Sequence, residues 1–179
     1  MTASLPFRSG PRPRTSDDIP HRQLDQQPPD AGHLDALLDE ASTWPGIVEG
    51  PSGISVEGAR ALSIDAATVA GPDEAFLVGR EFGHGHAQGD FSLHVTLPVE
   101  LATRAEAAGW AEPHLWVHTG ALPPNVVMLY APRDAEERDV TLSLLRAAYE
   151  FARGSTSLHT PATAPPTGSS RPHDPQESP

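Results

Sequence analysis

The clearest pattern along the chain is an alternation of apolar and polar residues over Phe91–Leu97. A period of two is typical of a half-buried strand, and here it places His94 on the more polar face. Residues 114–118 alternate in the same way, so both histidines of this segment are expected to face one side. Residues 126–130 are apolar at every position, which predicts a strand that is covered on both faces, or one that is covered by helices on one face.

Three other segments have apolar residues at spacings of three and four, as amphipathic helices do. They cover residues 34–41, 98–109 and 134–154, and the last begins with a capping box formed by Asp134 and Glu137. The order along the chain is thus a helix, several strands, a short helix, two strands and a long helix. This order predicts an α+β fold in which two or three helices pack on a mainly antiparallel sheet.

The composition changes at both ends of the chain. Residues 1–30 are rich in Pro, Arg, Ser and Asp, and residues 155–179 are rich in Pro, Ser and Thr. Neither segment has enough apolar surface to offset the entropy of ordering it. We therefore expect a disordered arm, a single α+β domain over residues 31–154, and a disordered tail. The arm also lacks the apolar run of a signal peptide or membrane anchor, so we expect a cytoplasmic protein without membrane contact.

Residue usage narrows the chemistry. All twelve basic residues are arginine and there is no cysteine, which excludes lysine Schiff bases, thiol nucleophiles, disulfides and cysteine-ligated metals. The formal net charge of -12 argues against nucleic acid as a partner, because phosphate contacts need clustered positive charge. A small molecule is the expected partner.

Histidines are concentrated in the middle of the chain, where five of the nine fall within one short stretch. An extended backbone over residues 80–86 would put Phe82, His84 and His86 on a common face. Two imidazoles at this spacing can share one metal ion, and His84, His86 and His94 together are a candidate site for iron or zinc. The alternative is a hydrogen-bonded polar network without a metal.

Three blocks of residues occur in a fixed order. They are Arg80-Glu81-x-x-His84-x-His86-x-x-x-Asp90-x-x-x-His94, then Gly109-Trp110-x-Glu112-x-His114, then Tyr130-Ala131-Pro132-Arg133 followed by Glu136-Glu137. Together these blocks resemble the luciferase domain shared by fungal luciferases and many short bacterial proteins. The resemblance spans about residues 75 to 153.

The resemblance implies an oxidoreductase of the monooxygenase or dioxygenase type that acts on an enolisable aromatic or pyrone-like small molecule. Fungal luciferases oxidise 3-hydroxyhispidin with molecular oxygen and without a known organic cofactor. By this analogy the catalytic residues are His84, His86, Asp90, His94, His114 and Arg133. The residues that bind the substrate are Arg80, Glu81, Trp110, Glu112, Trp116, His118 and Tyr130. Molecular oxygen is the expected co-substrate, no other cofactor is expected, and iron or zinc in the histidine cluster is the alternative.

The chain also departs from the family pattern. Leu115 stands where a proline is usual, the loop over residues 116–124 differs from the common glycine-rich one, and the membrane-anchoring segment of the fungal enzymes is not evident. We therefore do not expect light emission. A second hypothesis is a non-catalytic module that binds or senses a small molecule in the same histidine-lined pocket, because one fold can host several functions.

Overall fold

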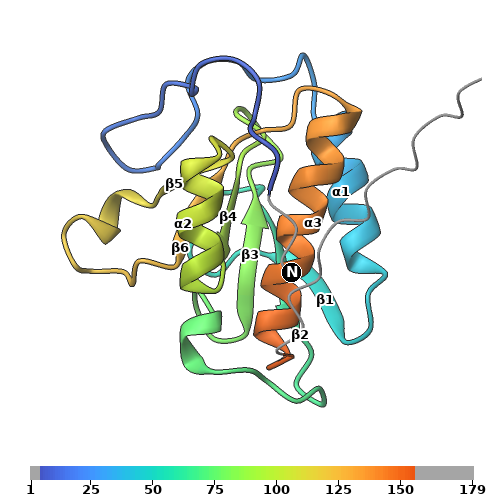
Figure 1. Ribbon diagram of the computed structural model, residues 1–179. Coiled ribbons are helices and arrows are strands. Elements are labelled where there is room, and N and C mark those ends of the chain that lie inside the picture. The colour runs from blue at the N-terminus through green and yellow to red at the C-terminus, as the bar shows by residue number, and fades with distance from the viewer. Residues whose placement is uncertain (1–4, 156–179) are drawn as a thin grey trace, which may run out of the picture.

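The computed structural model describes residues 5–155, within which a six-stranded sheet has the strand order β1-β2-β3-β4-β6-β5 (Figure 1). The strands are β1 (Ile47–Pro51), β2 (Arg60–Ile64), β3 (Glu81–Gly85), β4 (Leu93–Thr96), β5 (Ala111–Pro113) and β6 (Val126–Leu129). Every neighbouring pair is antiparallel. The α+β fold expected from the sequence is therefore confirmed.

Three α-helices lie on the same side of this sheet (Figure 1). They are α1 (Gly32–Ser42), α2 (Val99–Ala107) and α3 (Ala135–Ala152), and two short 3-10 helices are η1 (Asp73–Ala75) and η2 (Leu115–Val117). Asp134 caps the start of α3 by accepting the Glu137 N–H at 2.8 Å, whereas the Glu137 carboxylate accepts the Arg133 N–H at 3.0 Å, so one half of the expected capping box is present. None of the helices within residues 5–155 is long and apolar enough to cross a membrane.

The strand register divides the sheet into two different faces. It pairs His84 with His94, His94 with Met128, and Met128 with Glu112, so these side chains form one row on a common face. Gly85 faces the other way, because a Cβ atom added there would lie 2.8 Å from a leucine of α1. The helices and the apolar core therefore cover one face, and the histidines lie on the opposite face.

A β-bulge in β3 separates Phe82 from the histidines. The pairing of β2 with β3 skips Phe82, and one extra residue reverses the alternation of a strand. Phe82 points into the helix-covered core, where its ring centroid lies 6.3 Å from that of Tyr149. The expectation that Phe82 shares a face with His84 and His86 is therefore wrong. The bulge also turns Glu81 to the side of His84, although the two are three residues apart.

Residues 5–30 form what we call the strap, an irregular segment that crosses the end of the sheet (Figure 1). This is a correction to the expected disordered arm, because His21 and Gln23 of the strap are 2% and 1% exposed. The low apolar content of these residues predicted disorder, whereas the strap is held to the domain mainly by polar contacts. The expected disordered tail lies, from residue 156 onward, outside the residues that the structure describes.

Hydrogen bonds tie the strap to residues far away in the sequence. Trp110 donates its indole N–H to the Pro6 carbonyl at 2.6 Å, and Arg8 donates to the Glu137 carboxylate at 3.2 Å. Gln23 donates its backbone N–H to Asp90 at 2.7 Å, and its side-chain oxygen accepts the Ala131 N–H at 2.8 Å. Arg133 donates to the Ser9 carbonyl at 2.8 Å.

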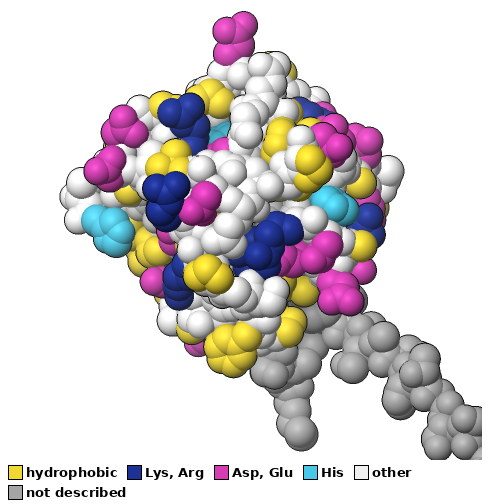
Figure 2. All heavy atoms as spheres, turned by 90° about the horizontal axis from the view of Figure 1, so that it is seen from above, with side chains coloured by type: hydrophobic (Ala, Val, Ile, Leu, Met, Phe, Trp, Pro, Cys, Tyr) yellow, Lys and Arg dark blue, Asp and Glu magenta, His cyan; other side chains and the backbone are white. Residues whose placement is uncertain are grey.

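Seen from above, arginine and acidic side chains are interspersed on the surface rather than gathered in one large basic patch (Figure 2).

The loop before η1 docks on the end of α3 at a close backbone contact. Gly71 donates its N–H to the Ala152 carbonyl at 2.7 Å, and a Cβ atom there would lie 2.8 Å from the Gly154 nitrogen and collide with the Phe151 carbonyl. We expect Gly71→Ala to destabilise the protein by about 1–3 kcal/mol, as other overpacking substitutions do. Urea denaturation would measure this. Gly50→Ala is the matched control, since nothing lies within 4 Å of its added methyl group, and equal losses in both variants would contradict the prediction.

Candidate functional site

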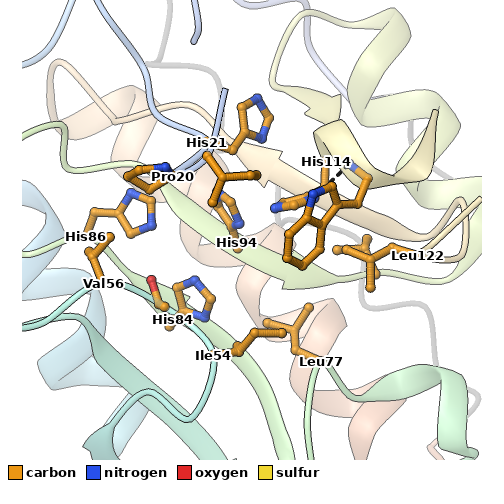
Figure 3. A pocket seen from close by; sticks show the side chains of 14 residues that line it. Pro20, His21, Ile54, Val56, Leu77, His84, His86, His94, His114 and Leu122 are labelled. Atoms are coloured by element: carbon orange, nitrogen blue, oxygen red, sulfur yellow. Dashed lines mark hydrogen bonds between the residues drawn. The ribbon is translucent and has the colours of Figure 1, made fainter. Parts of the chain in front are cut away.

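A cavity of about 230 Å³ lies on the sheet face opposite the helices (Figure 3). Its wall combines the strap, the loop between β1 and β2, strands β3 and β4, and the segment around η2. The lining residues are Ile19, Pro20, His21, Ile54, Ser55, Val56, Leu77, His84, His86, His94, His114, Trp116, Leu122 and Val126. Five imidazoles therefore meet in a pocket whose other walls are mainly apolar.

His94 lies at the centre of the five imidazoles. Its ring centroid is 4.9 Å from that of His114, 5.0 Å from His86, 5.2 Å from His84 and 5.5 Å from His21. Four of the five come from the part of the chain in which the sequence predicted a site, and β4 and β3 place His94 and His84 directly opposite each other. The fifth, His21, comes from the strap.

Three of the imidazoles donate a ring N–H to a carboxylate. The pairs are His84 Nδ1 with Glu81 Oε1 at 2.7 Å, His86 Nδ1 with Asp90 Oδ1 at 2.9 Å, and His21 Nε2 with Glu112 Oε1 at 2.7 Å. Because an ionised carboxylate can only accept, each pair fixes the tautomer of its histidine. The second ring nitrogen of each neutral imidazole then carries a lone pair.

The three carboxylates are held in the ionised form. Burial alone would raise their pKa values, but the hydrogen bonds from the histidines and from neighbouring groups leave the pKa values of Glu81, Asp90 and Glu112 below their ordinary values. Glu112 also accepts the Tyr130 hydroxyl at 2.9 Å. Burial, together with the charge of Glu112, raises the pKa of Tyr130, so this hydroxyl remains a donor.

Burial keeps the central imidazoles neutral. It lowers the pKa of His94 well below the ordinary value, and the surrounding imidazoles lower it further. The pKa of His114 falls to about 4 for the same two reasons. Burial also lowers the pKa of His84, although Glu81 partly opposes this shift. At neutral pH these three rings are therefore uncharged.

Two buried ring nitrogens have no hydrogen-bond partner within residues 5–155, namely His94 Nε2 and His21 Nδ1. A ring nitrogen of each lies within 4.8 Å of the other and of a ring nitrogen of His114. In the described part of the chain, this is the one group of three possible ligands that is so close. It differs from the set of His84, His86 and His94 that the sequence suggested as a metal site.

The backbone around His114 is not the strand that its alternation predicted. Strand β5 ends at Pro113, and His114 Nδ1 accepts the Trp116 N–H at 3.1 Å, which starts the 3-10 turn of η2. The expected common face of 114–118 is therefore wrong. His114 and Trp116 both line the cavity, Trp116 from its rim with 40% of its surface exposed, whereas His118 is exposed and is not among the lining residues.

The family comparison now agrees with this geometry. The family model described as the luciferase domain matches residues 79–148, which include four of the five cavity histidines. These residues are therefore similar to the luciferase domain. No solved structure matches the chain.

Curated relatives of the luciferase domain are fungal luciferases from the genus Armillaria. The luciferase of Armillaria ostoyae is 28% identical over 163 residues, as is that of Armillaria gallica, and the luciferase of Armillaria mellea is 27% identical. Each alignment covers 82% of this chain and 60% of the relative. The chain thus spans less than two thirds of the length of these proteins.

Three residues that the sequence linked to the substrate or to catalysis bind other parts of the protein, namely Arg80, Trp110 and Arg133. Arg80 donates to the carbonyls of Ile64 and Asp65, both at 2.8 Å. Trp110 and Arg133 both bind the strap, and neither is among the residues that line the cavity. Their contacts are described above and connect the matched domain to the segment before it.

Glu81, Asp90, Glu112 and Tyr130 stand behind the cavity histidines and orient them. None of the four is among the lining residues, and Glu81 and Asp90 are each 4% exposed. Through their hydrogen bonds they orient the rings, and their predicted catalytic or substrate-binding roles stay predictions.

Little in the amino-acid sequence pointed to His21 as a cavity residue. It lies in a proline-rich polar segment with no periodicity, and its partner Glu112 is 91 residues away. The apolar lining residues Ile19 and Ile54 also precede the luciferase domain. A signal available in the sequence was the Ile19-Pro20-His21 triplet, which places a histidine close to an apolar residue within a mostly polar arm.

Proposed function

We propose that this protein uses molecular oxygen to oxidise an enolisable aromatic or pyrone-like small molecule in the histidine cavity. The observation that carries the proposal is the set of five imidazoles, three of them bonded to carboxylates, around a mainly apolar cavity. Such a pocket can remove a proton from a hydroxyl group and exclude water from the anion that forms. The luciferase domain and its fungal relatives support an oxygen-dependent reaction.

Proton removal is the first step of the proposed reaction. His84 and His86 are the candidate bases, because carboxylates hold their Nδ1–H groups and leave Nε2 with a lone pair. The substrate O–H bond breaks, an N–H bond forms at Nε2, and the electron pair stays on the substrate as an enolate. The new imidazolium is stabilised by the carboxylate behind it, Glu81 or Asp90.

Oxygen enters in the second step. The enolate carbon supplies two electrons to molecular oxygen, a carbon–oxygen bond forms, and the resulting peroxide anion takes the proton back from the imidazolium. Substrate carbon is oxidised and oxygen is reduced to the level of a peroxide. This sequence needs a base and a cation beside the developing anion, and we propose that it runs without an organic cofactor.

The size of the cavity limits the ligand. Its 230 Å³ lies below the roughly 300–1,000 Å³ of pockets that enclose a drug-sized molecule. A compound of one or two rings is the size that we propose, with any further apolar part at the mouth. Ile19, Ile54 and Trp116 line the cavity, and between 40% and 49% of the surface of each is exposed. These partly exposed apolar side chains suit contact with an apolar part of the ligand at the mouth.

Oxygen uptake with hydroxy-pyrones, styryl-pyrones and related enols tests this function. We expect turnover, and we expect His84→Ala to lower kcat by about 100- to 10,000-fold, the usual contribution of a general base. His118→Ala is the control, since His118 lies outside the cavity, and circular dichroism would confirm that both variants fold. Full activity of His84→Ala would contradict the assigned base. Tight binding of these compounds without oxygen uptake would instead support a binding or sensing module.

A further inference from the structure

His21, His94 and His114 form a group distinct from the two candidate bases. All three are buried, with 2%, 5% and 8% of their surfaces exposed. His94 and His114 lie beside His21 of the strap (Figure 3). We propose that this group binds a divalent first-row transition metal ion, with His21 of the strap as one of its three ligands. The site would complete the cavity from a segment that precedes the luciferase domain.

Unpartnered nitrogens are the first support for this site. A buried polar atom without a hydrogen-bond partner is unfavourable, and native proteins leave few of them. His94 Nε2 and His21 Nδ1 are both in this state, within the described part of the chain. One metal ion at about 2.0–2.1 Å from each nitrogen would satisfy both, after the rings move inward from their present spacing of up to 4.8 Å.

The groups behind His21 are the second support. A histidine that binds a metal usually donates its other N–H to a carboxylate, which fixes the tautomer and makes the ligand more basic. Glu112 accepts the His21 Nε2–H at 2.7 Å and is itself held by the Tyr130 hydroxyl at 2.9 Å. The Nδ1 lone pair of His21 is therefore oriented before any ion arrives.

His114 must change its protonation to take part. Its Nδ1 accepts the Trp116 N–H, so its Nε2 carries the proton in the neutral ring. Ligation through Nε2 would break this bond, and coordination of the metal ion by the imidazole would replace it. Metal binding should therefore disturb the Trp116 backbone.

Three imidazole ligands and a fourth position open to the cavity suit zinc or ferrous iron. Ionised Glu112 lies directly behind His21, and ionised Glu81 and Asp90 lie behind the neighbouring His84 and His86, so the charges around the site favour a cation over an anion. An ion in this position would lie beside His84 and His86. It could then hold the substrate oxygen from which one of them removes the proton.

Titration of the full chain with Zn²⁺ and Co²⁺, after dialysis against a chelator, tests the site. Calorimetry should show one ion per chain, and Co²⁺ should give the visible absorption of a low-coordinate nitrogen site. We expect His21→Ala and His94→Ala each to abolish stoichiometric binding, and His118→Ala, with its exposed imidazole, to retain it. The measurement needs no substrate, so its failure is distinct from failure of the proposed oxidation.

Two milder readouts keep the test decisive if an alanine variant fails to fold. Glu112→Gln should weaken binding about 10- to 100-fold, as loss of a carboxylate behind a ligand does. Zn²⁺ should also shift the Trp116 backbone amide resonance in the unaltered protein. Absence of binding would overturn the proposal. So would binding that survives His21→Ala but is lost in His84→Ala or His86→Ala, because that result would place the ion on the other histidines.

Discussion

A chain that lacks residues 1–30 is expected to lose turnover and metal binding and to be destabilised by about 3 kcal/mol or more, although the luciferase domain is left whole. The deletion removes His21 from the cavity and uncovers His94, which lies beneath the strap. It also removes one hydrogen-bond donor from each of three carboxylates, those of Asp90, Glu112 and Glu137. Each hydrogen bond to a charged group contributes about 1.5–3 kcal/mol to stability. Thermal or urea unfolding and metal titration would measure the effect.

Single substitutions in the strap separate stability from site chemistry. Gln23→Ala leaves the buried Ala131 N–H without its acceptor, which should cost about 1–3 kcal/mol and leave His21 in place. Leu24→Ala is the neighbouring control, because Leu24 is 48% exposed. A shortened chain that kept full stability and metal binding would show that the strap is dispensable.

Acidification is expected to destabilise the metal-free protein well above the pH at which carboxylates titrate. The folded-state pKa values of His84, His94 and His114 lie below the ordinary value of 6.5. As the pH falls below about 6.5, the unfolded chain takes up protons that the folded chain does not. Stability is therefore complete above this pH and is lost progressively below it, for His114 down to about pH 4.

The size of this loss follows from the number of neutral histidines. Each one contributes up to about 1 kcal/mol per pH unit, so three together can remove several kcal/mol, against a typical total of about 5–15 kcal/mol. Urea denaturation at several pH values between 7 and 4.5, with a chelator present, would measure the slope. His94→Gln should give a shallower slope than the unaltered chain. A stability that stays constant from pH 7 to pH 5 would contradict the neutral state assigned to these rings.

Local patterns anticipated the elements that bury one regular face. The strand around His94, the helix that starts at Asp134 and the antiparallel sheet all follow from periodicity, because each side chain is sorted by a single choice between core and surface. Clustering along the chain likewise anticipated His84, His86 and His114. These residues lie on neighbouring strands or beside them, so closeness in sequence became closeness in space.

What periodicity missed depends on single competing contacts. The bulge at Phe82 reversed one strand, and the ring of His114 captured a backbone N–H and turned the following residues into η2. Burial of His21 rests on Glu112, a partner with no sequence signal to connect them. Residues of the family blocks such as Trp110 and Arg133 proved to anchor the strap, a role visible only when both segments are seen together.

The strap makes one wall of the cavity from a segment that is separate in sequence from the strands carrying the other histidines. A gene fragment cut at the boundaries of the family match would consequently encode an incomplete pocket. The same arrangement offers a practical opening for engineering. Grafting the corresponding segments of relatives, together with the residues that anchor them, would change the shape of the pocket and the ligand that it accepts while the strand order of the sheet stays the same.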